Sequence, residues 1–166
     1  MSEEDNLPCT LLNNIESAVK ILIKNLHKPN FHGHIQIDSD CDGYTSGALL
    51  LNYIYAVFPT AIDNFSYSFH ATKTHGINLD LIPPNTTLVI APDSSSNDYD
   101  IHKTLNDKGI DVLVLDHHHA DKVSEYACVV NNQLCDYPTK SLSGVGIVYK
   151  FCQYLDQVLE QPGFVD

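Results

Sequence analysis

The chain has 166 residues, of which 43% are hydrophobic and 18% charged, and its formal net charge is −12. This length and composition suit one compact domain with an ordinary core. No stretch approaches 18 consecutive apolar residues, and the N-terminus is acidic where a secretory signal is basic. We therefore expect a soluble, cytoplasmic protein without a membrane span, whose oligomeric state the sequence does not indicate.

One residue type dominates each sign of charge: 16 of the 21 acidic residues are Asp, and all nine basic residues are Lys. Arg is the usual bidentate partner of phosphate, and proteins that grip nucleic-acid backbones carry basic surfaces. The isolated chain is therefore expected to bind nucleic acid poorly. Its five cysteines form no Cys-x-x-Cys pair, which argues against a disulfide framework and against a thiolate zinc site.

Helices and strands alternate along the sequence. Apolar residues recur at helical spacing from Leu11 to Leu26, which predicts an amphipathic helix. A strand is predicted at His34–Asp38 and a helix at Ser46–Phe58, with the acidic residues between them in a loop. The later elements are strands at 65–69 and 87–90, a helix at 98–108, strands at 111–115 and 128–130, and a helix at 144–159.

This alternation predicts an α/β fold with a mainly parallel sheet and helices on both faces. Residues 1–30 are expected to form an N-terminal helical segment that packs on the rest, and residues 31–166 the functional domain. Ligands of open parallel sheets bind beyond the carboxyl ends of the strands. Three of the predicted strands are followed by side chains that can bind metal ions or transfer protons. The first is followed by Asp38, Asp40 and Asp42, the second by Asp93, and the third by Asp116, His117 and His118.

If these strands are neighbours, carboxylates and imidazoles converge in a set suited to Mn²⁺ or Mg²⁺. Two such ions can activate water and stabilise the attacking and leaving oxygens of a phosphoryl centre. The four carboxylates of Asp38, Asp40, Asp42 and Asp93, with neutral His117, would hold them. His118 would then be free to contact a phosphate oxygen or protonate a leaving group.

Simpler interpretations stand beside this one. Asp38 to Gly43 resembles half of a calcium loop, but Leu49 occupies the position of its Glu, and Asp93 taken alone favours a helix cap. The Ser143-Gly144-Val145-Gly146 sequence is a weak phosphate-cradling signal. The Tyr and Phe side chains are assigned to the core rather than to a base-stacking surface, and the remaining histidines, His34 and His70 among them, to structural positions.

Four segments in this order resemble the DHH phosphoesterase superfamily, and within it the RecJ-like branch. They are Asp38-Ser39-Asp40-Cys41-Asp42-Gly43, Pro92-Asp93, Asp116-His117-His118 and Leu142-Ser143-Gly144-Val145-Gly146. The resemblance covers roughly residues 30 to 155. It implies a catalytic domain with two Mn²⁺ or Mg²⁺ ions that hydrolyses phosphoester bonds, as in exonucleases that act on single-stranded DNA in repair or recombination.

The resemblance also implies roles for single residues. Asp38, Asp40, Asp42 and His117 match metal ligands, and Asp93 matches a bridging carboxylate. Asp116 would orient the two histidines, and His118 would contact the scissile phosphate.

The sequence departs from the family pattern in two places. Ser94-Ser95 replaces a small residue followed by Gly, and no counterpart of a fourth, downstream metal-binding Asp is present. We therefore expect an incomplete C-terminal part, no second substrate-binding domain, and weak or undetectable activity of the chain alone. Two alternatives stay open. One is a small-substrate phosphoesterase, such as a pyrophosphatase, oligoribonuclease or cyclic-dinucleotide phosphodiesterase, because His34 precedes Asp38 by four residues; the other is a non-catalytic binding module.

Overall fold

Five parallel strands form a single sheet in the computed structural model, which describes residues 7–70 and 76–160. In spatial order they are β2 (Phe65–Phe69), β1 (Gly33–Ile37), β3 (Leu88–Pro92), β4 (Asp111–Asp116) and β5 (Cys128–Asn131). Each neighbouring pair runs parallel. The predicted α/β class with a parallel sheet is confirmed.

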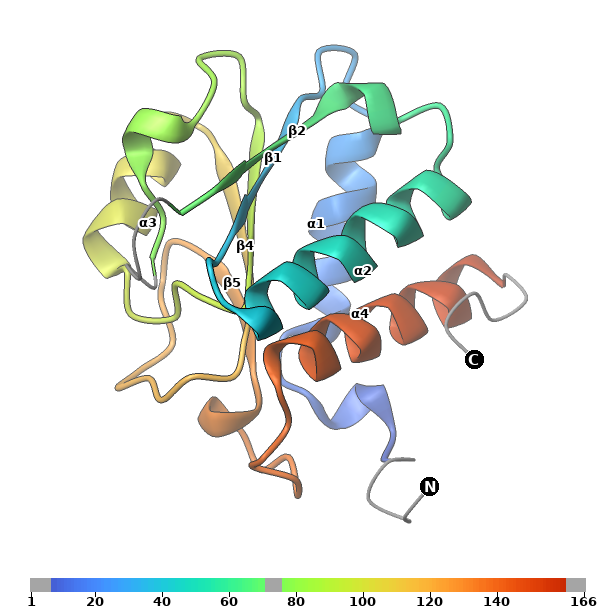
Figure 1. Cartoon of the computed structure of the whole chain (residues 1–166), viewed down its shortest axis with the longest axis vertical. Coiled ribbons are helices and arrows are strands. Elements are labelled where there is room, and N and C mark those ends of the chain that lie inside the picture. Colours follow the sequence, from blue (N-terminus) through green and yellow to red (C-terminus); the bar gives the residue numbers. More distant parts are fainter. Residues whose placement is uncertain (1–6, 71–75, 161–166) are drawn as a thin grey trace.

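Helices cover both faces of the sheet, as Figure 1 shows. Helices α1 (Ile15–Leu26), α2 (Cys41–Val57) and α4 (Gly144–Leu159) pack on one face, and α3 (Tyr99–Asp107) lies on the other. Alternate residues of each inner strand face opposite layers: Leu113 and Leu115 join the larger cluster, whereas Val112 and Val114 join the smaller one. Burial on both faces explains the continuous apolar runs in the sequence.

Two predicted helix starts are wrong by several residues, each for a local reason. The first helix begins at Ile15 instead of Leu11, because Asn14 takes a left-handed φ of 58° immediately before it. The second begins at Cys41 instead of Ser46, because the Asp40 side chain caps it by accepting the Gly43 N–H at 2.9 Å. Asp42 therefore lies in the first turn of α2 and not in a loop.

The assignment of the aromatic side chains to the core is wrong for part of the set. Tyr137 and Phe151 are fully buried, but four aromatic side chains are at least 46% exposed: Tyr44, Tyr55, Tyr67 and Phe69. Within residues 7–70 and 76–160, no helix has both the length and the apolar character that crossing a membrane requires.

Candidate metal centre

The candidate site lies where the path of the chain reverses direction across the sheet. From β1 the chain crosses to β2 on one side, and from β3 it continues to β4 and β5 on the other. In open parallel sheets, such a reversal leaves a crevice beyond the carboxyl ends of the two central strands. Asp38 directly follows β1 and Asp93 directly follows β3. The topology therefore brings these two carboxylates together.

Asp93 is the most constrained residue of the site. Its side chain is fully buried, its Oδ1 has only Nε2 of His117 at 3.1 Å, and its Oδ2 has no hydrogen-bond partner. Burial raises the pKa of Asp93, against the opposing effect of His117. A buried carboxylate with a single imidazole as its polar contact is costly unless a cation compensates it. This is the observation that fits a metal ion.

The backbone around Asp93 is specialised as well. Asp93 itself has a φ of 62° and Ser95 a φ of 83°, a region that residues other than Gly rarely adopt. Ser95, where the pattern that the sequence resembles has Gly, thus adopts a left-handed conformation that Gly would adopt without steric cost. The Ser95 hydroxyl donates a hydrogen bond to Asp98 at 2.6 Å, which anchors the loop.

Asp42 connects the first turn of α2 to the start of α4. Its two oxygens accept the N–H groups of Gly144 and Val145 at 2.8 and 2.9 Å. A carboxylate at this position satisfies amides that the helix leaves free and interacts favourably with its dipole. Oδ2 of Asp42 also lies 3.5 Å from Nε2 of His117. The predicted role of Asp42 as a metal ligand stays a prediction.

The end of β4 supplies a hydrogen-bonded histidine pair. Oδ1 of Asp116 accepts hydrogen bonds from Nδ1 of His118 at 2.8 Å and from the backbone N–H of His117 at 2.8 Å. Burial alone would raise the pKa of Asp116, but bonds from His118 and Ser96 hold the pKa at about 2. The same contact with Asp116 raises the pKa of His118 to about 9.

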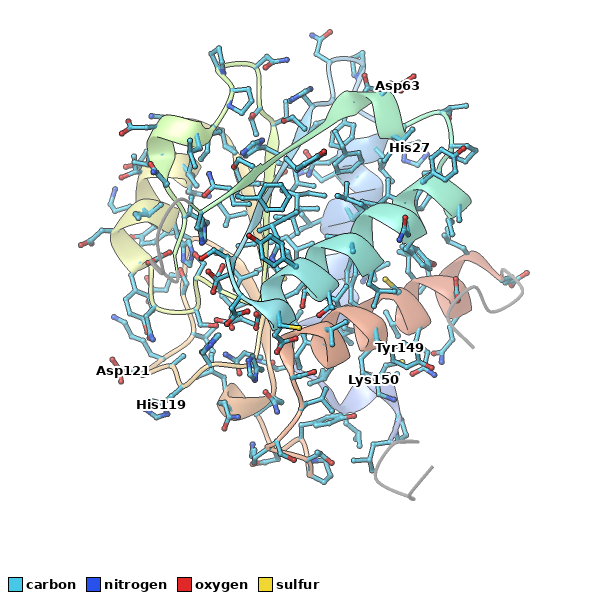
Figure 2. The ribbon with its side chains drawn as sticks, in the orientation of Figure 1. His27, Asp63, His119, Asp121, Tyr149 and Lys150 are labelled. Carbon is cyan, nitrogen blue, oxygen red and sulfur yellow. The ribbon has the colours of Figure 1, made fainter. Side chains whose placement is uncertain are left out.

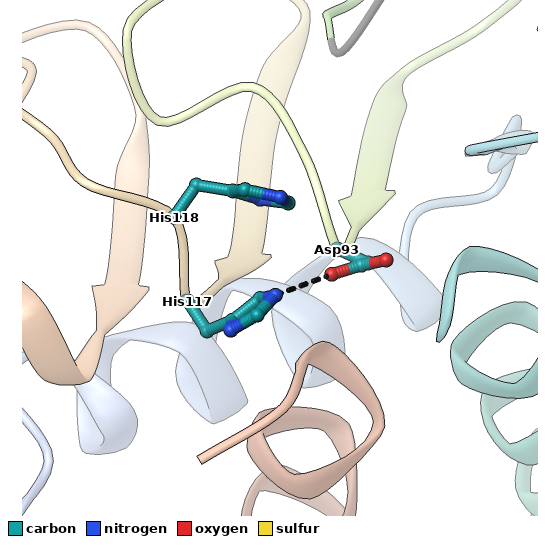
Figure 3. Close-up of side chains that lie close together, drawn as sticks. All are labelled: Asp93, His117 and His118. Carbon is teal, nitrogen blue, oxygen red and sulfur yellow. Dashed lines mark ion pairs between the residues drawn. The ribbon is translucent and has the colours of Figure 1, made fainter. Parts of the chain in front are cut away.

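Both imidazole rings extend toward Asp93, as the close-up in Figure 3 shows. The neighbouring Asp93 carboxylate raises the pKa of His117 above its ordinary value. Figure 2 places His119, the third histidine of the run, at the periphery of the molecule beside Asp121, and its side chain is 90% exposed. The run therefore divides into two inward rings and one that faces solvent.

His70 is a residue of the site that the sequence reasoning missed. It follows β2, its side chain is 1% exposed, and its Nδ1 lies 3.3 Å from Oδ1 of Asp38. Its other ring nitrogen, Nε2, is buried without a hydrogen-bond partner. His70 lies beside Asp38 because β2 pairs with β1. That pairing cannot be predicted from the spacing of residues in the sequence.

His34, by contrast, has the structural position assigned to it. It is buried on β1, and its ring nitrogens lie 2.8 and 3.0 Å from the hydroxyls of Ser66 and Ser68. Among the other structural histidines, His102 is buried between the hydroxyls of Ser95 and Ser124. His75 lies outside the described residues.

The first turn of α4 has its amides already engaged. The N–H of Gly144 donates to Asp42, and that of Gly146 donates to the Ser143 hydroxyl at 3.2 Å. A Cβ at position 144 would lie 2.1 Å from Oδ1 of Asp93, so only Gly lets the helix approach the carboxylate. The predicted substrate contacts of Ser143, Gly144 and Gly146 stay a prediction.

Potential ligand atoms gather in two groups that share one residue. Asp38, Asp40 and Asp93 form the first, and Asp93, His117 and His118 form the second; within each, one ligand atom per residue lies within 4.8 Å of the others. Carboxylate oxygen with imidazole nitrogen suits Mn²⁺ and related divalent ions. The fold and these side chains thus define a parallel α/β protein with carboxylate and histidine side chains grouped as a divalent cation would require.

Comparison with known proteins identifies the family. Residues 32–164 match the DHH family, N-terminal domain, and the chain belongs to this family. A prophage-derived relative from Bacillus subtilis (strain 168), provisionally named single-strand DNA-specific exonuclease YorK, is 45% identical over 151 residues. That alignment covers 90% of this chain and 26% of the relative. The single-stranded-DNA-specific exonuclease RecJ of Salmonella typhimurium is 28% identical, with 96% and 29% covered.

Solved structures agree on the fold. A crystal structure of exonuclease RecJ bound to manganese superposes with a TM-score of 0.79 at 20% identity, covering 95% of this chain and 41% of that one. RecJ from Thermus thermophilus in complex with Mn²⁺ gives a TM-score of 0.75 at 21% identity, with 96% and 24% covered. The chain spans about a quarter of the length of the curated relatives it matches.

Proposed function

We propose that this chain is the metal-binding catalytic part of a RecJ-like nuclease that hydrolyses phosphodiester bonds of single-stranded DNA. The observation that carries the proposal is Asp93: it is fully buried, its Oδ2 accepts no hydrogen bond, and it belongs to both groups of potential ligands. The names of the relatives, which describe exonucleases specific for single-stranded DNA, supply the substrate class.

The residues divide by role in this proposal. Asp38 and Asp40 would hold one ion and His117 a second, with Asp93 shared between them, while Asp42 fixes α4 against the site. When bound, two divalent ions would supply the positive charge that activates water and stabilises the reacting oxygens of the phosphate. No Arg is present in the chain to take over this electrostatic work.

Asp116 and His118 act on the substrate side of the site. The Asp116 carboxylate orients the His118 ring through Nδ1, and a ring held in this way can donate a proton through its other nitrogen, Nε2. We assign that nitrogen to a phosphate oxygen or to the leaving oxygen, where a donor stabilises developing negative charge. Loss of Asp116 should therefore lower turnover by releasing His118 rather than by removing a ligand.

The small-substrate alternative rested on His34, and the structure gives it no support. That ring is bonded to Ser66 and Ser68 on β2, away from the carboxylates. A DNA strand is thus the substrate we test first.

The test is the Asp93→Asn variant, assayed for Mn²⁺ uptake by calorimetry at pH 7.5 and for nucleotide release from single-stranded DNA. We expect the wild-type chain to bind Mn²⁺ and to gain thermal stability from it, since a ligand that binds only the folded state stabilises it. Asp93→Asn should lose both the uptake and any hydrolysis. The matched control is Asp63→Asn, an exposed acid on the turn before β2. Unchanged Mn²⁺ binding in Asp93→Asn would contradict the bridging role.

A further inference from the structure

Three exposed aromatic side chains, Tyr44, Tyr67 and Phe69, gather in one place, and we call them the aromatic cluster. They are 48%, 56% and 46% exposed, respectively. The ring centroids of Tyr44 and Phe69 lie 5.4 Å apart, and those of Tyr67 and Phe69 lie 5.7 Å apart. The ring planes are inclined by 53° and 74° in these pairs. The rings are therefore in contact without covering one another face to face.

The cluster forms where α2 meets the edge of the sheet. Tyr67 and Phe69 are alternate residues of β2, which is an edge strand, and pair in register with Ile35 and Ile37 of β1. These side chains point to the face of the sheet that α2 covers. Tyr44 comes from the first turns of α2. Two rigid elements thus hold the three rings in a fixed arrangement.

The aromatic cluster is continuous with the candidate metal centre. The backbone N–H of Tyr44 donates to the carbonyl of Asp40 at 3.0 Å, and Phe69 directly precedes His70, whose ring contacts Asp38. On both of its elements, the cluster is therefore next to residues of the candidate centre, which would let a bound strand reach both.

The aromatic composition of this surface favours a ligand with a planar ring. The exposed large aliphatic side chains of the described residues lie on other segments, at Leu11, Leu81, Val123 and Val158. Aromatic rings bind nucleobases by stacking, and this interaction needs no positive charge. That property matters in a chain with a net charge of −12, which repels the phosphates of a DNA strand.

We propose that the aromatic cluster binds an unpaired base of the DNA strand whose phosphate lies at the metal centre. This inference rests on the proposed function and adds a binding site to it. Paired bases are already stacked within a duplex and cannot present a free face, so the cluster would also favour single strands over double strands.

The test compares two phosphorothioate oligothymidylates of equal length, one intact and one with abasic residues. We expect the wild-type chain with Mn²⁺ to bind the intact strand about tenfold more tightly. Tyr44→Ala and Phe69→Leu should bring this ratio toward one, whereas Tyr44→Phe, which keeps the ring, should retain it. Tyr55→Ala is the matched control, because Tyr55 is 66% exposed on the same helix, roughly 16 Å further along its axis.

A second readout reports the stacking directly. An oligonucleotide carrying 2-aminopurine should lose fluorescence on binding to the wild-type chain and to Tyr55→Ala, but not to Tyr44→Ala. Thermal unfolding of each variant establishes that it is folded. Equal quenching by wild type and Tyr44→Ala would overturn the proposal.

The outcomes separate this inference from the proposed function. In one outcome, the chain hydrolyses an abasic phosphodiester strand with Mn²⁺ and binds intact and abasic strands with equal affinity. This result would overturn the base-binding role of the cluster and support the proposed nuclease activity. A base preference that depends on Tyr44, in a chain that takes up no Mn²⁺ by calorimetry, would support the cluster and contradict the metal-dependent nuclease. Tyr44→Ala could also leave base binding unchanged and alter only the oligomeric state of the protein in solution. That result would overturn the base-binding role and assign the rings to a contact between copies.

Discussion

The small size of Gly144 lets α4 approach Asp93. A Cβ at this position would come within 2.1 Å of the carboxylate oxygen, so Gly144→Ala must move either the helix or Asp93. We expect about tenfold weaker Mn²⁺ binding, because a ligand displaced by a few tenths of an ångström loses its geometry. Calorimetry measures this change.

Gly109→Ala provides the contrast for that variant. Gly109 has a φ of 74°, and a Cβ added there would meet nothing within 4 Å. The variant should lose about 1 kcal/mol of stability from backbone strain and keep its Mn²⁺ affinity. Equal affinity losses in the two variants would contradict the role of Gly144.

His70 is expected to position Asp38. The hydrogen bond to a ligand carboxylate fixes its orientation, and loss of such a partner weakens metal binding by about 10- to 100-fold. His70→Leu should therefore lower Mn²⁺ affinity by about tenfold while the protein stays folded, since Leu also removes the unpartnered Nε2. His34→Gln, a buried change on the adjacent strand, should leave the affinity unchanged; an equal loss there would argue for a general effect of packing.

At the level of elements, α4 depends on residues far away in the sequence. Ser143 caps it locally through Gly146, whereas Asp42, which is 102 residues from Gly144, accepts two of its amides. Ser143→Ala should cost about 1 kcal/mol of unfolding free energy. Asp42→Ala should cost more, about 2 kcal/mol, because two donors lose a charged acceptor. Urea unfolding without metal measures both, and a smaller loss for Asp42→Ala would refute the comparison.

The sequence predicted the elements wherever one local signal dominates. The strand Phe65–Phe69 and the helix Gly144–Leu159 have the predicted boundaries, because alternation and a capping Ser mark them. The convergence of Asp93 with His117 was predictable too, since parallel strands end at one edge of the sheet. The contacts of His70 and of the aromatic cluster could not be predicted, because they depend on the pairing of β2 with β1. This pairing joins distant segments and has no local signal in the sequence.

At the scale of the whole molecule, acid should weaken the fold through buried neutral histidines. Burial, and to a smaller extent the charge of His32, lowers the pKa of His34 to about 4 from its ordinary value of 6.5. Between these values the unfolded chain binds more protons than the folded one, so stability falls as pH drops from 6.5 to 4. The contribution of His34 is at most about 3 kcal/mol.

Denaturant titrations at pH 7, 6 and 5 test this expectation. The loss of unfolding free energy should be smaller in His34→Gln, whose amide can still bond the hydroxyls of Ser66 and Ser68 but does not titrate in this range. The same pH slope in wild type and variant would rule out His34 as a source of the acid sensitivity.

The bond between Asp42 and the start of α4 also has a consequence for how the protein reaches its native state. Parallel pairing and a carboxylate anchored 102 residues away give the chain many contacts between distant segments, and such topologies fold slowly because long loops must close first. During synthesis, the candidate ligand residues from Asp38 to His118 leave the ribosome before the helix that Asp42 anchors. The candidate metal centre is therefore complete only after α4 has been synthesised.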